Sequence, residues 1–147
     1  MTDKNDKVDK NDRKLIYIAD DDYSIREAIK AFLESSDYVV KAFETGDALL
    51  LEFGRKPSDM VILDVMMPGK HNGFSVLKEI RAVSIVPIIM LTARDSDLDY
   101  QTGLDLGSDD FFTKPVSPMN LVMRVKAIFR RIEYERTAYE NILAKKS

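Results

Sequence analysis

The stretch VILDVMMPG, residues 61–69, places one carboxylate, Asp64, at the end of a run of apolar residues and just before a turn. A short run rich in Val, Ile and Leu is typical of a strand that is covered on both faces, as in a parallel sheet. Pro68 and Gly69 mark the turn that follows the strand. Because a buried charge is costly unless another group pairs with it, Asp64 needs partners at this strand end.

Apolar segments of the same kind alternate with helical patterns along the whole chain. The strand-like segments are 15–19, 38–40, 60–63, 87–91 and 111–112. Apolar residues recur at helical spacing within 24–33, 45–53, 73–80, 98–106 and 117–128. Five strand–helix units in succession imply right-handed crossovers. The sequence therefore predicts an α/β fold, a doubly wound five-stranded parallel sheet with helices on both faces.

The chain divides into three regions by composition. Its 147 residues suit one domain with a substantial core. Residues 1–14 repeat Asp-Lys pairs with little hydrophobicity, which predicts a disordered polar tail. Residues 15–131 hold the predicted domain. In 132–147 the apolar stripe thins, and a helical extension and a linker are both compatible with the pattern.

Composition also excludes several classes of protein. Cys is absent and His71 is the one histidine, so neither a disulfide framework nor an ordinary zinc site is expected. The formal net charge of −3 gives no basic field for nucleic acid, so any DNA contact would come from a part outside this chain. No apolar run approaches the roughly 20 residues of a membrane span, and no signal segment is evident. We expect a cytoplasmic protein without membrane contact.

Four carboxylates follow two of the predicted strands. Asp20, Asp21 and Asp22 come directly after the first strand, and Asp64 closes the third. In a flavodoxin-like strand order, 2-1-3-4-5, these two strand ends are neighbours at the edge where ligands bind. Two carboxylates about 4 Å apart repel by about 4 kcal/mol at an effective dielectric near 20, and a divalent cation relieves that repulsion. Oxygen ligands favour Mg²⁺, whereas Asp22 or Ser24 is expected to cap the following helix.

Four segments, in this order, resemble the receiver domain of response regulators of two-component signalling. They are IYIADDD (16–22), VILDVMMPG (61–69), IIMLTA (88–93) and DDFFTKP (109–115). The resemblance extends over about residues 15–131. The segment KPVSPMNLVMRVKAIFRR (114–131) is most similar to the OmpR/PhoB subfamily, whose members continue into a winged-helix DNA-binding domain.

The resemblance implies a role for each site residue. Asp64 would be the phosphoacceptor that takes a phosphoryl group from the phosphohistidine of a sensor histidine kinase. Mg²⁺ would be held by Asp20, Asp21, Asp64 and the backbone carbonyl of Met66. Lys114 would supply positive charge to the transferred group, and Thr92 a hydroxyl. The chain would not be an enzyme in the ordinary sense, because it would catalyse only its own phosphorylation and dephosphorylation.

The family also implies a switch. Thr92 would move toward the phosphoryl group, and Phe111, where many members carry Tyr, would turn inward to fill the space left behind. The surface of the fourth helix, fifth strand and fifth helix would change and form a homodimer when phosphorylated. Charges of both signs there suggest a self-complementary interface. They are Asp99, Asp105, Asp109, Asp110, Arg124, Lys126 and Arg130.

The sequence departs from the family pattern after Asp64. The turn through Lys70, His71, Asn72 and Gly73 is one residue longer than the common one, and His71 is expected on its surface. Met66, two residues after Asp64, is apolar where a polar side chain could steer water. We therefore expect slow self-hydrolysis of the acyl phosphate.

Other functions fit the residues less well. A haloacid-dehalogenase-type phosphatase needs an acid two residues after its nucleophile, where this chain has Met66. A dinucleotide-binding domain needs glycines after the first strand, where this chain has three aspartates. Two outputs stay open for a receiver. One is control of transcription through a DNA-binding domain absent from this chain. The other is a stand-alone receiver acting in a phosphorelay or as a protein-interaction module.

Overall fold

The computed structural model describes residues 12–93 and 97–146, and for 97–100 it describes the backbone alone. Most of the predicted polar tail, residues 1–11, lies outside the described residues. The strands are β1 (Leu15–Ala19), β2 (Val39–Phe43), β3 (Met60–Asp64), β4 (Ile88–Thr92) and β5 (Asp110–Thr113). The helices are α2 (Tyr23–Ser35), α3 (Gly46–Arg55), α4 (Gly73–Arg81), α5 (Asp97–Leu106) and α6 (Pro118–Lys146).

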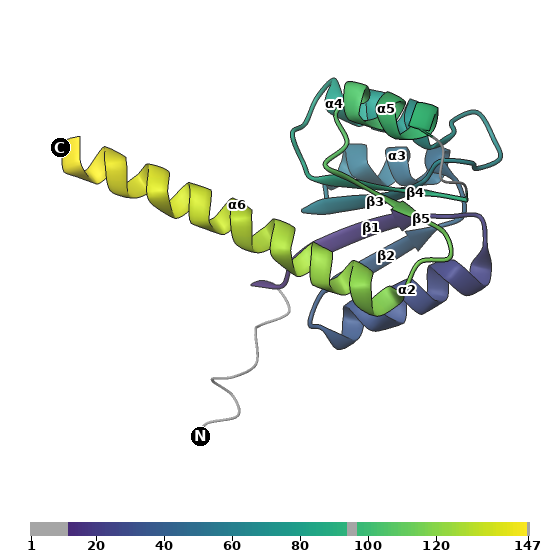
Figure 1. Cartoon of the computed structure of the whole chain (residues 1–147), viewed down its shortest axis with the longest axis horizontal. Coiled ribbons are helices and arrows are strands. Elements are labelled where there is room, and N and C mark those ends of the chain that lie inside the picture. The colour runs from purple at the N-terminus through teal and green to yellow at the C-terminus, as the bar shows by residue number, and fades with distance from the viewer. Residues whose placement is uncertain (1–11, 94–96, 147) are drawn as a thin grey trace.

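The five strands form one parallel sheet in the order β2-β1-β3-β4-β5 (Figure 1). This is the order predicted from the sequence. Ala19 of β1 lies opposite Leu63 of β3, so the next residue of each strand, Asp20 and Asp64, reaches the same edge of the sheet. Asp64 in turn lies opposite Leu91 of β4. The register therefore determines which side chains can meet at the carboxyl ends of the strands.

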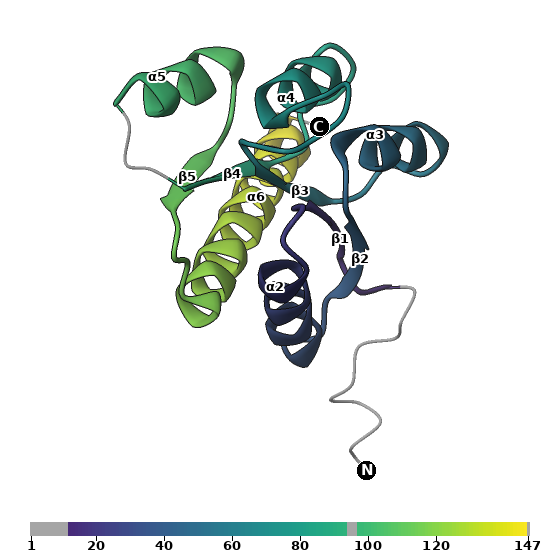
Figure 2. The same cartoon turned by 90° about the vertical axis from the view of Figure 1, so that its right-hand side faces the viewer.

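Helices cover both faces of the sheet, as predicted. Figure 2 shows α3, α4 and α5 on one face and α2 and α6 on the other. The alternation of side chains along β1 divides the core accordingly: Tyr17 and Ala19 pack with α3 and α4, whereas Ile16 and Ile18 pack with α2 and α6. Because both faces are covered, all four of these residues are fully buried.

Short polar side chains begin three of the helices. Asp22 accepts a hydrogen bond from the amide of Ile25 (3.1 Å) at the start of α2. Thr45 accepts one from Ala48 (3.1 Å) at the start of α3. Asn72 accepts one from Ser75 (2.9 Å) at the start of α4. Each cap satisfies an amide that has no partner inside its helix. Of the two residues expected to cap the first helix, Asp22 does so.

The buried face of α2 differs from the expected one by one position. Phe32, expected on the apolar face with Ile25, Ile29 and Leu33, is 41% exposed. The buried residues of α2 are instead Arg26, Ile29 and Leu33. Helical spacing alone allows either Arg26 or Phe32 on the buried face, since both choices place Ile29 and Leu33 inside.

The last helix is long. α6 packs on the sheet through Leu121 and Val125 and then continues to Lys146 beyond the domain (Figure 1). The region 132–146, for which a helix and a linker were both open, is helical. Arg136 contacts Glu133 (2.5 Å) and Glu140 (3.8 Å), which lie on the same side of the helix at spacings of three and four residues. Among the described residues, no helix combines the length and the apolarity that crossing a bilayer requires.

Candidate functional site: an acidic pocket at the carboxyl edge of the sheet

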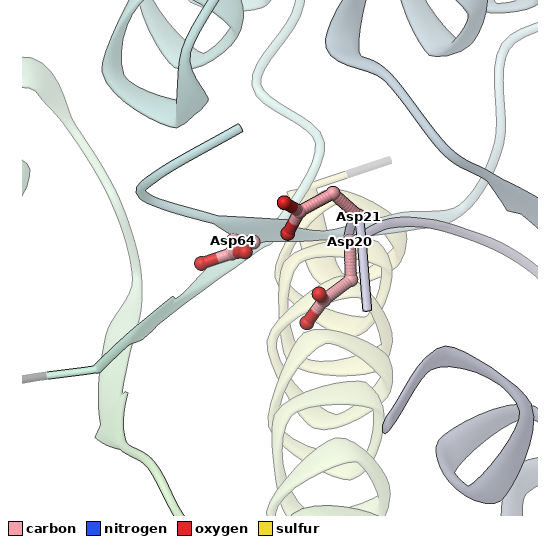
Figure 3. Close-up of side chains that lie close together, drawn as sticks. All are labelled: Asp20, Asp21 and Asp64. Atoms are coloured by element: carbon pink, nitrogen blue, oxygen red, sulfur yellow. The ribbon is translucent and has the colours of Figure 1, made fainter. Parts of the chain in front are cut away.

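Three carboxylates meet at the neighbouring ends of β1 and β3. Asp20 is fully buried and Asp64 is 3% exposed, whereas Asp21 is exposed. One oxygen from each lies within 4.8 Å of the others (Figure 3). The structure thus brings together the three aspartates that the sequence predicted for a metal site. They meet because the register of β1 and β3 ends both strands at the same level.

Lys114 inserts its ammonium between two of these carboxylates. Its Nζ lies 3.0 Å from Asp20 Oδ2 and 3.2 Å from Asp64 Oδ2. Lys114 follows β5 immediately, and its amide donates a hydrogen bond to the carbonyl of Thr92 (2.6 Å), which anchors it at the end of β4. The peptide bond between Lys114 and Pro115 is cis. One cation therefore faces the phosphoacceptor predicted from the sequence.

The donor set fits a hard divalent cation. Asp20 Oδ1 accepts a hydrogen bond from the amide of Asp22 (2.9 Å). Asp20 Oδ2 is buried and lies 3.0 Å from the ammonium of Lys114, which is shared with Asp64. Three carboxylates outnumber the one ammonium, and oxygen donors of this kind suit Mg²⁺.

Burial and charge shift the pKa of both central groups. Burial, and next the carboxylate of Asp20, raise the pKa of Asp64 to about 7, against the opposing effects of Lys114 and the Met66 amide. Burial alone would lower the pKa of Lys114, but its contacts with Asp20 and Asp64 outweigh burial and raise it. Lys114 is therefore charged at neutral pH, whereas Asp64, with a pKa of about 7, is about half ionised there.

Stabilisation by Mg²⁺ is expected to depend on pH. The pKa of Asp64 is about 7 in the folded protein, above the ordinary value of 3.8. The preference of folded Asp64 for its proton therefore stabilises the fold fully below about pH 4, and this stabilisation is lost as pH rises through 7. Mg²⁺ needs the ionised carboxylate, and its apparent affinity should be about tenfold lower at pH 6 than at pH 8. Thermal unfolding with and without Mg²⁺ at both pH values measures this. Equal shifts in Tm at the two pH values would contradict the prediction.

The remaining predicted residues lie around this pocket. Thr92, buried at the end of β4, follows the residue that faces Asp64 across the sheet. The amide of Met66 donates to Asp64 Oδ1 (3.3 Å), while its side chain is 69% exposed. Phe111 lies farther away on β5, half-buried against the α4 side of the core. A Cβ on Gly103 of α5 would lie 2.4 Å from the ring of Phe111. The absence of a side chain at position 103 therefore makes room for this ring.

Two residues of the site were not identified as such from the sequence. Gly73, expected only to open a helix, has no room for a side chain, because a Cβ there would lie 2.2 Å from the carbonyl oxygen of Asp64. Arg26 donates from Nη1 to the carbonyl of Asp20 (2.7 Å) and is 6% exposed. A signal for Arg26 was its spacing of three and seven residues from Ile29 and Leu33, which puts it on the buried stripe.

The longer turn after Asp64 is held against α3. Asp47 Oδ1 accepts the amide of His71 (3.1 Å) and lies 2.9 Å from its Nδ1. The hydrogen bond from the His71 ring is the largest cause of a lowered pKa at Asp47. His71, expected as a surface residue of the turn, is therefore bonded to a neighbouring helix. This contact ties the turn to the first turn of α3.

Comparison with known proteins agrees with this geometry. The family model of the response regulator receiver domain matches residues 16–126. RegX3 of Mycobacterium tuberculosis, a sensory transduction protein, is 41% identical over 116 residues, which are 79% of this chain and 51% of RegX3. ResD of Bacillus subtilis, a transcriptional regulatory protein, is 36% identical over 91% of this chain and 55% of ResD. The chain thus spans about half the length of the curated relatives it matches.

Solved structures show the same fold. The response regulator DrrB, described as a Thermotoga maritima OmpR/PhoB homologue, gives a TM-score of 0.75 at 31% identity, covering 81% of this chain and 54% of DrrB. The receiver domain of Klebsiella pneumoniae RstA gives 0.72 at 31% identity, covering 77% of this chain and 96% of that domain. With the acidic pocket, the strand order and these relatives in agreement, the chain belongs to the response-regulator receiver family and is most like its OmpR/PhoB members.

Proposed function

We propose that this chain is a phosphoacceptor switch in which Asp64 receives a phosphoryl group from the phosphohistidine of a sensor histidine kinase in a Mg²⁺-dependent reaction. One observation carries this proposal: the ammonium of Lys114 lies between Asp20 and Asp64 in a pocket of three converging carboxylates. A structural ion pair would need only one carboxylate for that ammonium. The excess of buried acid favours a site that receives cations and phosphoryl oxygens.

The transfer needs position and charge more than covalent help. An oxygen of Asp64 attacks phosphorus, the bond from phosphorus to the histidine nitrogen breaks, and its electron pair stays on the imidazole. Lys114, within 3.2 Å of Asp64, stabilises the negative charge on the phosphoryl oxygens, and Thr92 offers them a hydroxyl. The product is an acyl phosphate on Asp64.

The metal would be held by Asp20, Asp21, Asp64 and the backbone carbonyl of Met66. Bound Mg²⁺ supplies positive charge that keeps Asp64 ionised and neutralises the phosphoryl oxygens. Asp20 is well placed to contribute, because it is fully buried and one of its oxygens lies within 4.8 Å of oxygens of Asp21 and Asp64. Asp21 is exposed and can bind directly from the solvent side of the pocket.

Incubation with Mg²⁺ and acetyl phosphate tests the proposal directly. Intact-mass spectrometry should show one phosphate adduct on the wild-type protein, and chelation of Mg²⁺ should prevent its formation. The same adduct should form from a phosphorylated histidine kinase, which distinguishes a receiver from a general acceptor of reactive phosphates. A wild-type protein that stays unmodified by both donors would overturn the proposal.

The phosphorylated state should be long-lived because Met66 cannot orient water. Its side chain is exposed, two residues along the chain from Asp64, and carries no hydrogen-bonding group suited to a water molecule. Met66→Asn is expected to shorten the half-life of the acyl phosphate several-fold, up to about tenfold, within the range of general positioning effects. Release of inorganic phosphate after removal of the donor measures it. Met66→Leu is the apolar control, and equal half-lives for all three proteins would refute the idea.

We propose that phosphorylation changes the surface of α5, β5 and α6 through Thr92 and Phe111. This surface then forms a homodimer. Two of its acidic residues are already engaged within the chain: Asp110 with Arg124 (2.5 Å) and Asp109 with Arg81 (2.9 Å). The side chain of Asp99 lies outside the described ones. Of the seven charges named for this interface, those that are exposed and make no ion pair with a described residue are Asp105, Lys126 and Arg130.

The dimer is therefore expected to form through these remaining charges or by exchange of the internal pairs between two copies. Sedimentation equilibrium should show a shift from monomer toward dimer on phosphorylation, and the shift should weaken at high salt because surface charges are screened. Phosphorylated protein that stays monomeric at high concentration would contradict the proposed dimer.

The proposed output of the switch rests on relatives that are longer than this chain. We propose control of transcription through a DNA-binding domain outside these 147 residues, since ResD is described as a transcriptional regulatory protein. The alternative is a stand-alone receiver in a phosphorelay or an interaction module. In both cases the proposed partner is a sensor histidine kinase, the location is cytoplasmic, and the chain catalyses only its own phosphorylation and dephosphorylation.

A further inference from the structure

We propose that Arg26 is a positioning residue for the metal ligands: its buried guanidinium holds the backbone carbonyl of Asp20, and so fixes Asp20 and Asp21 in the arrangement that binds a divalent cation. The inference rests on the proposed function and adds a residue that acts through Asp20 without touching the metal or the phosphoryl group.

Arg26 is a buried charge with one directed side-chain hydrogen bond of ideal length. It lies in the first turn of α2 and is 6% exposed. Its Nη1 donates to the carbonyl oxygen of Asp20 at 2.7 Å, while its amide donates to the carbonyl of Asp22 at 3.0 Å. A hydrogen bond from a charged donor is stronger than a neutral one, and burial strengthens it further. Arg26 thus joins the start of α2 to the end of β1.

The carbonyl of Asp20 is the point at which the chain leaves the sheet. The amide of Asp20 still donates to the carbonyl of Phe43 on β2 (3.1 Å), which continues the pairing of β1 with β2 by one residue. Arg26 gives the carbonyl of the same residue its partner. Both backbone polar groups of Asp20 are thereby held, which restrains the backbone from which the side chains of Asp20 and Asp21 project.

The guanidinium of Arg26 also has two glutamates as charged neighbours. Glu27 lies 4.0 Å from Nε, and Glu44, largely exposed, lies 3.9 Å from Nη2. The ring of Tyr23 lies 5.3 Å from its Cζ. Among the described residues, no ion pair within 4.0 Å joins Arg26 to a carboxylate of the pocket, so Arg26 acts on Asp20 through the hydrogen bond to its backbone carbonyl.

Loss of Arg26 should weaken metal binding more than it affects the transfer step. Partners that orient metal ligands typically change affinity 10–100-fold when removed. We expect Arg26→Met, which keeps much of the side-chain volume, to weaken Mg²⁺ binding about tenfold. Arg26→Lys keeps the charge and a donor, so it should recover most of the affinity. Isothermal titration with MgCl₂ and no phosphate donor measures the Kd.

Kinetics separate positioning of the ligands from a general disturbance. The phosphorylation rate of Arg26→Met with acetyl phosphate should approach the wild-type rate at saturating Mg²⁺, with the half-saturating Mg²⁺ concentration raised about tenfold. Two controls should keep the wild-type Kd: Glu44→Gln, which removes the weak ion pair, and Ile80→Val, which loosens the core on the opposite face of the sheet. Ile80→Val shows that lower stability alone does not weaken Mg²⁺ binding.

A Kd for Arg26→Met within twofold of the wild-type value would overturn the inference. If that variant does not fold, Arg26→Gln replaces it, because Gln is too short to reach the Asp20 carbonyl, and the same twofold limit applies. Failure here is distinct from failure of the proposed function. Wild-type protein that binds Mg²⁺ and is phosphorylated on Asp64 keeps the proposed function whatever the Arg26 variants show.

Discussion

Asp64→Asn is expected to abolish phosphorylation, with a rate at least about 100-fold below that of the wild type, as for loss of a catalytic nucleophile. An amide oxygen is a poor nucleophile and a weak ligand for Mg²⁺, so the change removes the phosphoacceptor and one metal ligand together. Intact-mass spectrometry after incubation with acetyl phosphate and Mg²⁺ measures the adduct on both proteins over time.

The variant should remain folded, which makes the result interpretable. Burial and the carboxylate of Asp20 raise the pKa of Asp64 to about 7, so replacing it with a neutral group of the same size should stabilise the metal-free protein above that pH. Asp22→Asn is a matched control, since Asn also caps helices and the substitution keeps the backbone amide and carbonyl that contact Asp20 and Arg26. It should be phosphorylated at nearly the wild-type rate. An adduct that persists on Asp64→Asn would remove Asp64 from its role.

Gly73→Ala is expected to have the largest effect on stability, a loss of about 3 kcal/mol, at the upper end for overpacking. A Cβ at this position would lie 2.2 Å from the carbonyl oxygen of Asp64 and 2.8 Å from the Cα of Val65. Both are backbone atoms at the end of a buried strand, so neither can move without shifting β3. The amide of Gly73 also donates to the carbonyl of Val65 (2.9 Å), which holds α4 at this distance.

Gly54→Ala is expected to have the opposite effect on the stability of the protein. Gly54 lies in α3, and a Cβ there would meet no atom within 4 Å. Ala lowers the entropy of the unfolded chain and favours the helix, so this variant should be more stable by about 0.5–1 kcal/mol. Urea unfolding of the two variants and the wild type tests both expectations. A Gly73→Ala protein within about 1 kcal/mol of the wild type would show that β3 can move, contrary to the geometry.

Gly73→Ala is also expected to slow phosphorylation of Asp64. Because Asp64 and Gly73 are in contact through the Asp64 carbonyl, any shift that accommodates Ala at position 73 moves the phosphoacceptor relative to Lys114. Phosphorylation of Gly73→Ala below its unfolding temperature is therefore expected to be slower than in the wild type, whereas Gly54→Ala should be unaffected.

The sequence alone determined the fold and the place of the site. Continuous apolar runs marked the strands, helical spacing marked the helices, and their strict alternation implied a parallel sheet with both faces covered. These signals are local, because a continuous apolar run and a spacing of 3.6 residues both depend on residues close together in the sequence. The convergence of Asp20, Asp21 and Asp64 followed from this pattern together with the strand order, which makes the ends of the first and third strands neighbours at one edge. The strand order came in part from the family resemblance.

Only the tertiary structure decided which elements meet and how closely. It buried Arg26 under the Asp20 carbonyl and exposed Phe32, two positions that helical spacing could not separate. It showed that Gly73 is required by the approach of α4 to β3, and that Asp109 and Asp110 are already paired with arginines of the same chain. Each of these contacts joins segments far apart in sequence or in different elements. Their distances depend on packing, and a periodic pattern of residues does not contain that information.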